Sequence, residues 1–154
     1  MSQIVGFNEL KIGQRVKVKG QALEGGKFTA LEIVVKPDEE DVSFEGKLQS
    51  VELQTRTMRV MQRDFSVQSG VLIKNLARQD VGLDGLKVGD VIKVKGNYSP
   101  VRGFVPLKIK VQEPRGFAID ELQGAINKID RETNTIEVIG VAIALNEKTE
   151  IDGI

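Results

Sequence analysis

The sequence predicts an all-β protein built from two small β-barrels, and three observations lead to that prediction. Apolar and polar residues alternate with a period of two along several segments, as they do in half-buried strands. No stretch keeps helical spacing over three turns. Two sets of segments recur along the chain at offsets of 76 and 78 residues, which indicates an internal repeat.

The strands are clearest where lysines separate aliphatic residues. Residues 107–111 place three apolar side chains on one face and two lysines on the other, and residues 16–19 and 92–95 show the same pattern. Residues 141–145 are apolar on both faces, so we expect a strand that is more deeply buried than the others. Between the strands we expect short turns at 7–10 and 83–86, loops at 20–27, 97–103 and 131–134, and linkers at 38–41 and 114–120.

The repeat defines two kinds of half-unit. Residues 10–20 match residues 86–96 at seven of eleven positions, and Phe28 aligns with Phe104 at the same offset. At the second offset, residues 44–51 align with residues 122–129. One complete unit then contains about five short strands in roughly 70 residues, which is typical of a small, partly open barrel of the OB type.

The order of the half-units predicts the domains. Residues 42–113 form one complete central barrel, and residues 1–37 together with residues 118–154 supply the halves of a second one. A half-unit of roughly 35 residues buries too little surface to be stable alone. We therefore expect the terminal halves to pair, either within one chain as a circular permutant or between chains as a swapped dimer.

The same segments resemble a bacterial family. The residues that carry the resemblance are Gly124, Ala125, Ile126, Ile129 and Asp130 with Thr135, Ile136 and Val138, and the segment from Leu86 to Gly96. They are similar to domain-of-unknown-function family 5666, whose OB-like β domains are often repeated in envelope proteins and lipoproteins. The resemblance implies a fold and an envelope setting, and it supplies no catalytic residues.

Composition excludes the usual catalytic groups. The chain has no Cys and no His, so it lacks thiolate nucleophiles, the commonest general base and the commonest soft metal ligands. We expect a protein that is not an enzyme, with no cofactor and no metal site. No signal peptide and no transmembrane segment are visible, so we expect a soluble chain, cytoplasmic as given or in the envelope if a leader was removed.

Charge distribution gives the candidate ligand-binding residues. Residues 42–113 hold 12 Lys and Arg against 7 Asp and Glu, whereas the rest of the chain holds 10 against 15. The basic central unit either binds an anionic ligand or docks on the acidic terminal pieces. The candidates are Arg56, Arg59, Arg63, Lys93, Lys95 and Arg102 as contacts for anions, with Phe65 and Tyr98 as exposed stacking rings.

For most of these residues a plain solvated surface is the more economical interpretation. We therefore expect a non-catalytic module that binds or holds a protein or another envelope component. Single-stranded nucleic-acid binding through the basic face of the central barrel is the alternative.

Overall fold

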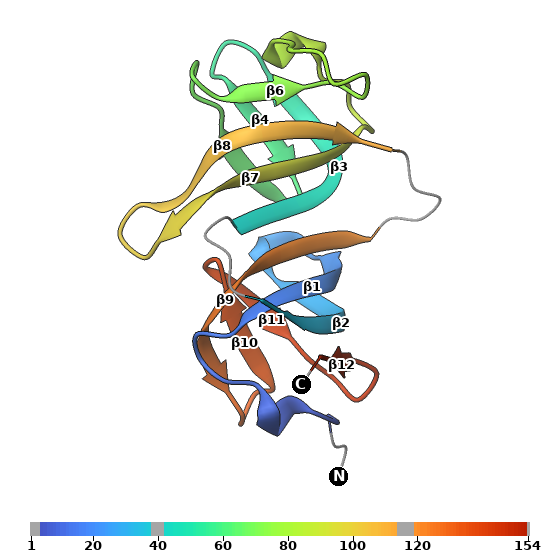
Figure 1. Ribbon diagram of the computed structural model, residues 1–154, viewed down its shortest axis with the longest axis vertical. Helices are drawn as coiled ribbons and strands as arrows, with labels where there is room; N and C mark the ends of the chain where they lie inside the picture. The colour runs from blue at the N-terminus through green and yellow to red at the C-terminus, as the bar shows by residue number, and fades with distance from the viewer. Residues whose placement is uncertain (1–3, 38–41, 114–118, 154) are drawn as a thin grey trace.

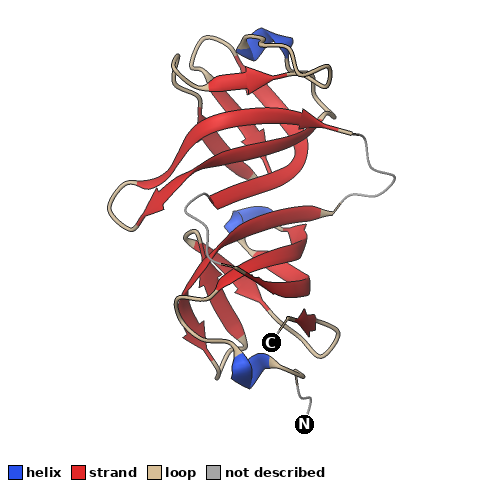
Figure 2. Ribbon diagram, in the orientation of Figure 1, coloured by secondary structure: helices blue, strands red, loops and turns tan. Residues whose placement is uncertain are grey.

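The computed structural model describes residues 4–37, 42–113 and 119–153, and these residues form an all-β protein. Twelve strands and three single-turn 3-10 helices follow one another in this part of the chain, with no α-helix (Figure 2). The strands divide into two groups that lie one above the other in Figure 1. We call them the terminal barrel and the central unit.

The terminal barrel combines both ends of the chain. Its strands are β1 (Arg15–Ala22), β2 (Phe28–Lys36), β9 (Asp120–Asp130), β10 (Thr135–Val138), β11 (Val141–Ala144) and β12 (Glu150–Asp152). Strand β1 pairs with β2 and β9, β9 with β10, β10 with β11, and β11 with β2 in parallel, so five strands close on themselves. Strand β12 adds to β2 in parallel outside this ring.

The central unit is formed by one continuous stretch of chain. Its strands are β3 (Val42–Glu52), β4 (Thr57–Val60), β5 (Arg63–Ser66), β6 (Leu72–Lys74), β7 (Val91–Ser99) and β8 (Gly103–Gln112). Strand β3 pairs with β4 and β7, β4 with β5, and β7 with β8, all antiparallel. Strand β6 adds to β8 in parallel, as β12 adds to β2. Within the described residues no ladder joins β5 to β8.

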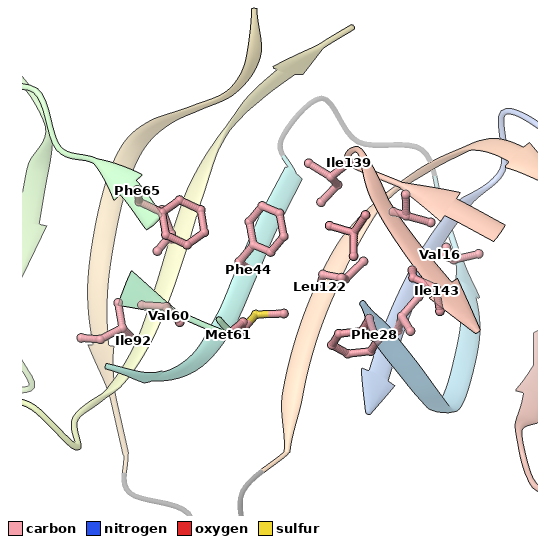
Figure 3. Close-up of a cluster of buried hydrophobic side chains, with 14 of the residues drawn as sticks. Val16, Phe28, Phe44, Val60, Met61, Phe65, Ile92, Leu122, Ile139 and Ile143 are labelled. Atoms are coloured by element: carbon pink, nitrogen blue, oxygen red, sulfur yellow. The ribbon is translucent and has the colours of Figure 1, made fainter. Parts of the chain in front are cut away.

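Strands β3 and β9 join the two groups. They run antiparallel, and Ser43 lies opposite Gln123, Phe44 opposite Leu122 and Glu45 opposite Glu121. Phe44 and Leu122 align with each other at the 78-residue offset, and they form the central pair of this short ladder. The ladder is therefore symmetric about that pair. Both side chains are fully buried, and Figure 3 shows them between the two clusters of apolar side chains.

The alternating pattern of the strands builds the core. Val16, Val18, Ile92, Val94 and Ile109 are buried, and the lysines between them lie on the outer face. In the central unit Phe44, Phe65 and Phe104 pack edge to face, with ring centroids 4.9–5.7 Å apart. The aliphatic side chains of β1, β2, β9, β10 and β11 fill the terminal barrel (Figure 3).

Two pairs of glycines let neighbouring elements approach closely. A Cβ on Gly20 or Gly96 would collide with the backbone carbonyl of Thr29 or Val105, where β1–β2 and β7–β8 each shift register. A Cβ on Gly46 would meet the side chain of Met61, and one on Gly124 would meet that of Ile139. At Gly20 and Gly96, where the collision is with backbone, larger residues would push the strands apart; at Gly46 and Gly124 the neighbouring side chains would have to move.

Most of the expected turns are found. The 3-10 helices at Phe7–Glu9 and Leu83–Gly85 occupy the predicted short turns, and residues 131–134 connect β9 to β10. The loop expected at 97–103 is shorter, because β7 continues to Ser99 and β8 begins at Gly103. The linkers at 38–41 and 114–118 lie outside the described residues, and Ile119 and Asp120 lead into and begin β9.

The prediction for residues 141–145 is wrong. Val141, Ile143 and Leu145 are buried, but Ala142 and Ala144 are exposed, so only one face of β11 is covered. Alanine is small enough to face water at little cost, which is why an unbroken apolar run can still have a solvated side. The central unit also has six strands where about five were expected.

Candidate ligand-binding surface

A ladder of lysines lies on the outer face of the β7–β8 hairpin. Lys93 is directly opposite Lys110, and Lys95 is directly opposite Lys108. Since residues two apart on a strand face the same side, all four ammonium groups share one face. Like charges directly opposite one another in a sheet are destabilising. Glu45 lies opposite Lys93 on the other side of β7, in the ladder with β3. The pair of Lys95 and Lys108 keeps a repulsion that a ligand of opposite charge would relieve.

The electrostatics of Lys110 show how concentrated this charge is. The pKa of Lys110 is held below its usual value, chiefly by the positive charge of Lys108 and then by that of Lys95. Burial, Lys93 and Arg78 add smaller effects in the same direction. No acidic group is among the causes of the shift. An anion placed over this face would meet several positive charges at once.

A groove runs beside the ladder, where β6 adds to β8. Its volume is about 510 Å³, within the range of small-ligand sites. Its lining consists of four cations, two side-chain amides, two aliphatic side chains and one acid: Lys74, Arg78, Lys108, Lys110, Asn75, Gln112, Leu76, Val111 and Glu113. Lys74 also forms a salt bridge with Asp80. We call Lys74, Arg78, Lys93, Lys95, Lys108 and Lys110 the lysine surface.

Of the residues predicted from the sequence, only Lys93 and Lys95 belong to this surface. Arg56 donates from Nε to the carbonyl of Val67 at 2.8 Å, so its side chain holds a loop. Arg59 forms a salt bridge with Asp64 across β4 and β5, with 3.1 Å between Nη1 and Oδ1. Arg102 lies at the tip of the β7–β8 hairpin, where its backbone N–H donates to Ser99 Oγ at 3.1 Å.

Two other candidates lie where the terminal barrel meets the central unit. The guanidinium carbon of Arg63 lies 5.9 Å from the ring centre of Phe44, and burial lowers the pKa of Arg63, partly opposed by Tyr98. Its Nη1 is 3.7 Å from the position that a Cβ on Gly26 would take. The Tyr98 hydroxyl is 3.1 Å from the corresponding position on Gly140. Both side chains thus pack against the terminal barrel.

The prediction that Phe65 is an exposed stacking ring is wrong. The side chain is only 5% exposed and packs against Phe44 and Phe104. In the 78-residue repeat Phe65 corresponds to Ile143, which is also buried. This correspondence was the signal that could have assigned the ring to the core.

The sequence reasoning missed four members of the lysine surface. Lys108 and Lys110 stand out in the alternation of residues 107–111, and a hairpin with the preceding strand would have placed them opposite Lys95 and Lys93. Lys74 and Arg78 reach the surface only because β6 pairs with β8, whose paired residues are 36 positions away along the chain. No local pattern indicates that pairing.

An acidic cluster lies at the corresponding place on the terminal barrel. The carboxylates of Glu32, Glu150 and Asp152 lie within 4.8 Å of one another. Glu150 is opposite Glu32 in the ladder between β12 and β2, and Asp152 is opposite Val34. We call these three residues the acidic surface.

Comparison with known proteins gives one family match. Residues 2–34 match the domain of unknown function DUF5666. The DUF5666 match includes β1 and most of β2, and it falls on the first copy of the segment that carries the resemblance in the sequence. No curated protein and no solved structure matches the chain significantly. The described residues include no helix with the length and apolar composition needed to cross a membrane.

Proposed function

We propose that this protein is a non-catalytic module of two OB-like units that binds an acidic polypeptide through its lysine surface. The observation that carries the proposal is the ladder in which Lys93 faces Lys110 and Lys95 faces Lys108. The absence of Cys and His from the sequence supports a role without catalysis. The resemblance to DUF5666 favours a bacterial envelope partner for the segment it covers.

The ladders support the view that the two units are copies, one of them circularly permuted. Strands β9, β1 and β2 are joined in the same way as β3, β7 and β8, at positions 76 or 78 residues apart. The parallel additions of β12 to β2 and of β6 to β8 also correspond, residue for residue. In this proposal the central unit is inserted between the two halves of the terminal barrel.

The chemistry of the surface favours a polypeptide over a single-stranded nucleic acid. Proteins that bind single strands without sequence preference combine basic grooves with exposed aromatic rings on which bases stack. Among the described residues, Phe7, Phe28, Phe44 and Phe65 are buried, and Phe104 and Tyr98 are half-buried against neighbouring groups. The lysine surface offers positive charge without such rings, which suits carboxylates.

The proposal is tested by titrating the protein with a fluorescent oligo-glutamate peptide at two salt concentrations. We expect binding that weakens as salt rises, because exposed charges are screened beyond about 8 Å at physiological ionic strength. The double variant K108Q/K110Q should bind at least about tenfold more weakly, a loss of about 1.4 kcal/mol. The control K11Q/K128Q changes the net charge equally, at two exposed positions of the terminal barrel, and should bind like the parent.

Two results would contradict the proposal. Absence of binding at low salt, or equal weakening by both double variants, would remove the lysine surface as the site. A single-stranded oligonucleotide of the same charge, titrated in parallel, tests the alternative. Tighter binding of the oligonucleotide than of the peptide would assign the surface to nucleic acid instead.

A further inference from the structure

The lysine surface and the acidic surface occupy the same place in their respective units. In the ladder between β6 and β8, Leu72 is opposite Lys108 and Lys74 is opposite Lys110. In the ladder between β12 and β2, the corresponding residues are Glu150 opposite Glu32 and Asp152 opposite Val34. Each set of four positions thus holds three charged residues and one aliphatic residue, with the sign of the charge reversed.

The two surfaces cannot neutralise each other within one molecule. Strands β7, β3, β9 and β1 lie between β8 and β2, so five strand spacings separate Lys108 from Glu32. Figure 1 shows β6 and β12, the outer strands of the two surfaces, toward opposite ends of the molecule, so the two sets of charges do not face each other. The contact between the units involves Phe44 and Leu122 instead.

Local partners balance only part of the charge on either surface. Lys19 lies opposite Glu32 in the ladder between β1 and β2, and Asp80 forms a salt bridge with Lys74. Glu150 and Asp152 are exposed and form no salt bridge within the described residues. On the other surface, Glu45 lies opposite Lys93 in the ladder between β3 and β7, and Glu113 lines the groove beside Lys110, so with Asp80 three acids stand against six cations. Both surfaces thus keep an excess of charge.

We propose that the lysine surface of one copy of this chain docks on the acidic surface of a second copy. This inference rests on the proposed function and names the acidic polypeptide as the chain itself. The three cations of the ladder between β6 and β8 meet the three carboxylates of the acidic surface. The exposed Leu72, at 41%, is available to pack against an apolar residue such as Val34. The formal charges of the chain sum to zero, so copies that approach one another carry no net repulsion.

The contact is heterologous, because two different surfaces of the chain meet. Each copy then has one surface of each sign available, and each can engage a neighbour. Association should therefore depend on concentration and weaken with salt, since charge complementarity drives it.

The experiment is a charge swap read out by light scattering and sedimentation, in EDTA so that no divalent cation bridges the carboxylates. The parent should show a mass that rises above 16.9 kDa with concentration at low salt and returns to 16.9 kDa at high salt. The variant K108E/K110E has an acidic residue in place of both lysines, and E32K/E150K has lysines in place of two acids. Each variant alone should remain at the monomer mass, and an equimolar mixture should associate again.

The control K11E/K128E reverses charge at two exposed positions outside both surfaces and should associate like the parent. Circular dichroism and thermal unfolding confirm that each variant is folded. A monomeric parent at low salt overturns the inference, as does undiminished association of either swapped variant or failure of their mixture to associate. If the parent stays monomeric but still binds the oligo-glutamate peptide, the proposed function stands alone; if it does neither, both fail.

Discussion

At the scale of single residues, Gly96 shows why one strand position requires a glycine. The ladder between β7 and β8 shifts register between Lys95 and Gly96 of β7, and the Val105 carbonyl of β8 occupies the space that a Cβ on Gly96 would need. The ring of Phe104 lies 2.9 Å from the same point. Gly20 has the same surroundings in β1, formed by Thr29 and Phe28.

We predict that Gly96→Ala lowers the free energy of unfolding by about 3 kcal/mol or more, because the collision is with backbone and relief requires the strands to separate. Urea denaturation followed by circular dichroism measures the effect. The matched control is Gly70→Ala, where a Cβ meets nothing within 4 Å, and its effect should stay within about 0.5 kcal/mol. Equal stabilities of the two variants would contradict this account of the glycine.

Single residues also mark where sequence interpretation succeeded and where it did not. The positive φ of Gly13 (95°) and Gly89 (98°) agrees with turns placed just before two strands. Phe65 lies between the polar Asp64 and Ser66, and the alternation of a half-buried strand directs those two neighbours to water and the ring to the opposite face. A ring in such a position belongs to the core.

At the scale of elements, the two units differ in how they close. Strand β11 lies between two neighbours, β10 and β2, whereas β5 forms a ladder only with β4 in the described part of the chain. The parallel contact of Ile143 with Phe28 and Ala144 with Thr29 thus seals the terminal barrel. The central unit has no such ladder between β5 and β8 in that part of the chain.

We predict that β5 exchanges its amide hydrogens faster than β11, because a strand with one ladder neighbour opens at lower free energy than a strand with two. Hydrogen exchange read by mass spectrometry on peptides covering residues 63–66 and 141–144 makes the comparison within one sample. Equal protection of the two peptides, or slower exchange in β5, would show that the central unit closes as firmly as the terminal barrel.

Strand positions could be predicted from alternation, because burial of one face imposes a period of two on the sequence. The pairing of β7 with β8 is local, since only residues 100–102 separate them. The pairing of β6 with β8 and of β12 with β2 is parallel and non-local, and the short strands carry little pattern of their own. The acidic surface and the Lys74 and Arg78 part of the lysine surface depend on those pairings, so they emerge only from the structure.

At the scale of the whole molecule, the chain begins and ends in the same barrel. Strands β1 and β2 form ladders with β9, β11 and β12 of the same chain, although 100 residues or more separate the paired positions, as from Gly20 to Asp120. The continuous segment from β3 to β8 lies between them in sequence and forms its own set of ladders. The terminal barrel therefore needs strands from both the N-terminal and the C-terminal segments, whereas the central unit needs neither for its own ladders.

We predict that deleting residues 1–37 unfolds residues 119–154 and leaves residues 42–113 folded. Strands β9 and β11 would lose β1 and β2, and a remaining half-unit buries too little apolar surface to hold together. Limited proteolysis with mass spectrometry should show rapid cleavage within residues 119–154 and a resistant fragment that contains residues 42–113. Resistance of the C-terminal segment would contradict the role of β1 and β2 as its partners.

The ladder between β3 and β9 has a consequence for how the residues on its two sides can change. Equivalent residues, Phe44 and Leu122, face each other there, as they would where two identical molecules meet across a two-fold axis. In such a pair every substitution appears twice, and dilution separates the partners. When both sides belong to one polypeptide, the tether keeps them together at any dilution. Each side is then free to change alone, so that one end can gather lysines while the other gathers carboxylates.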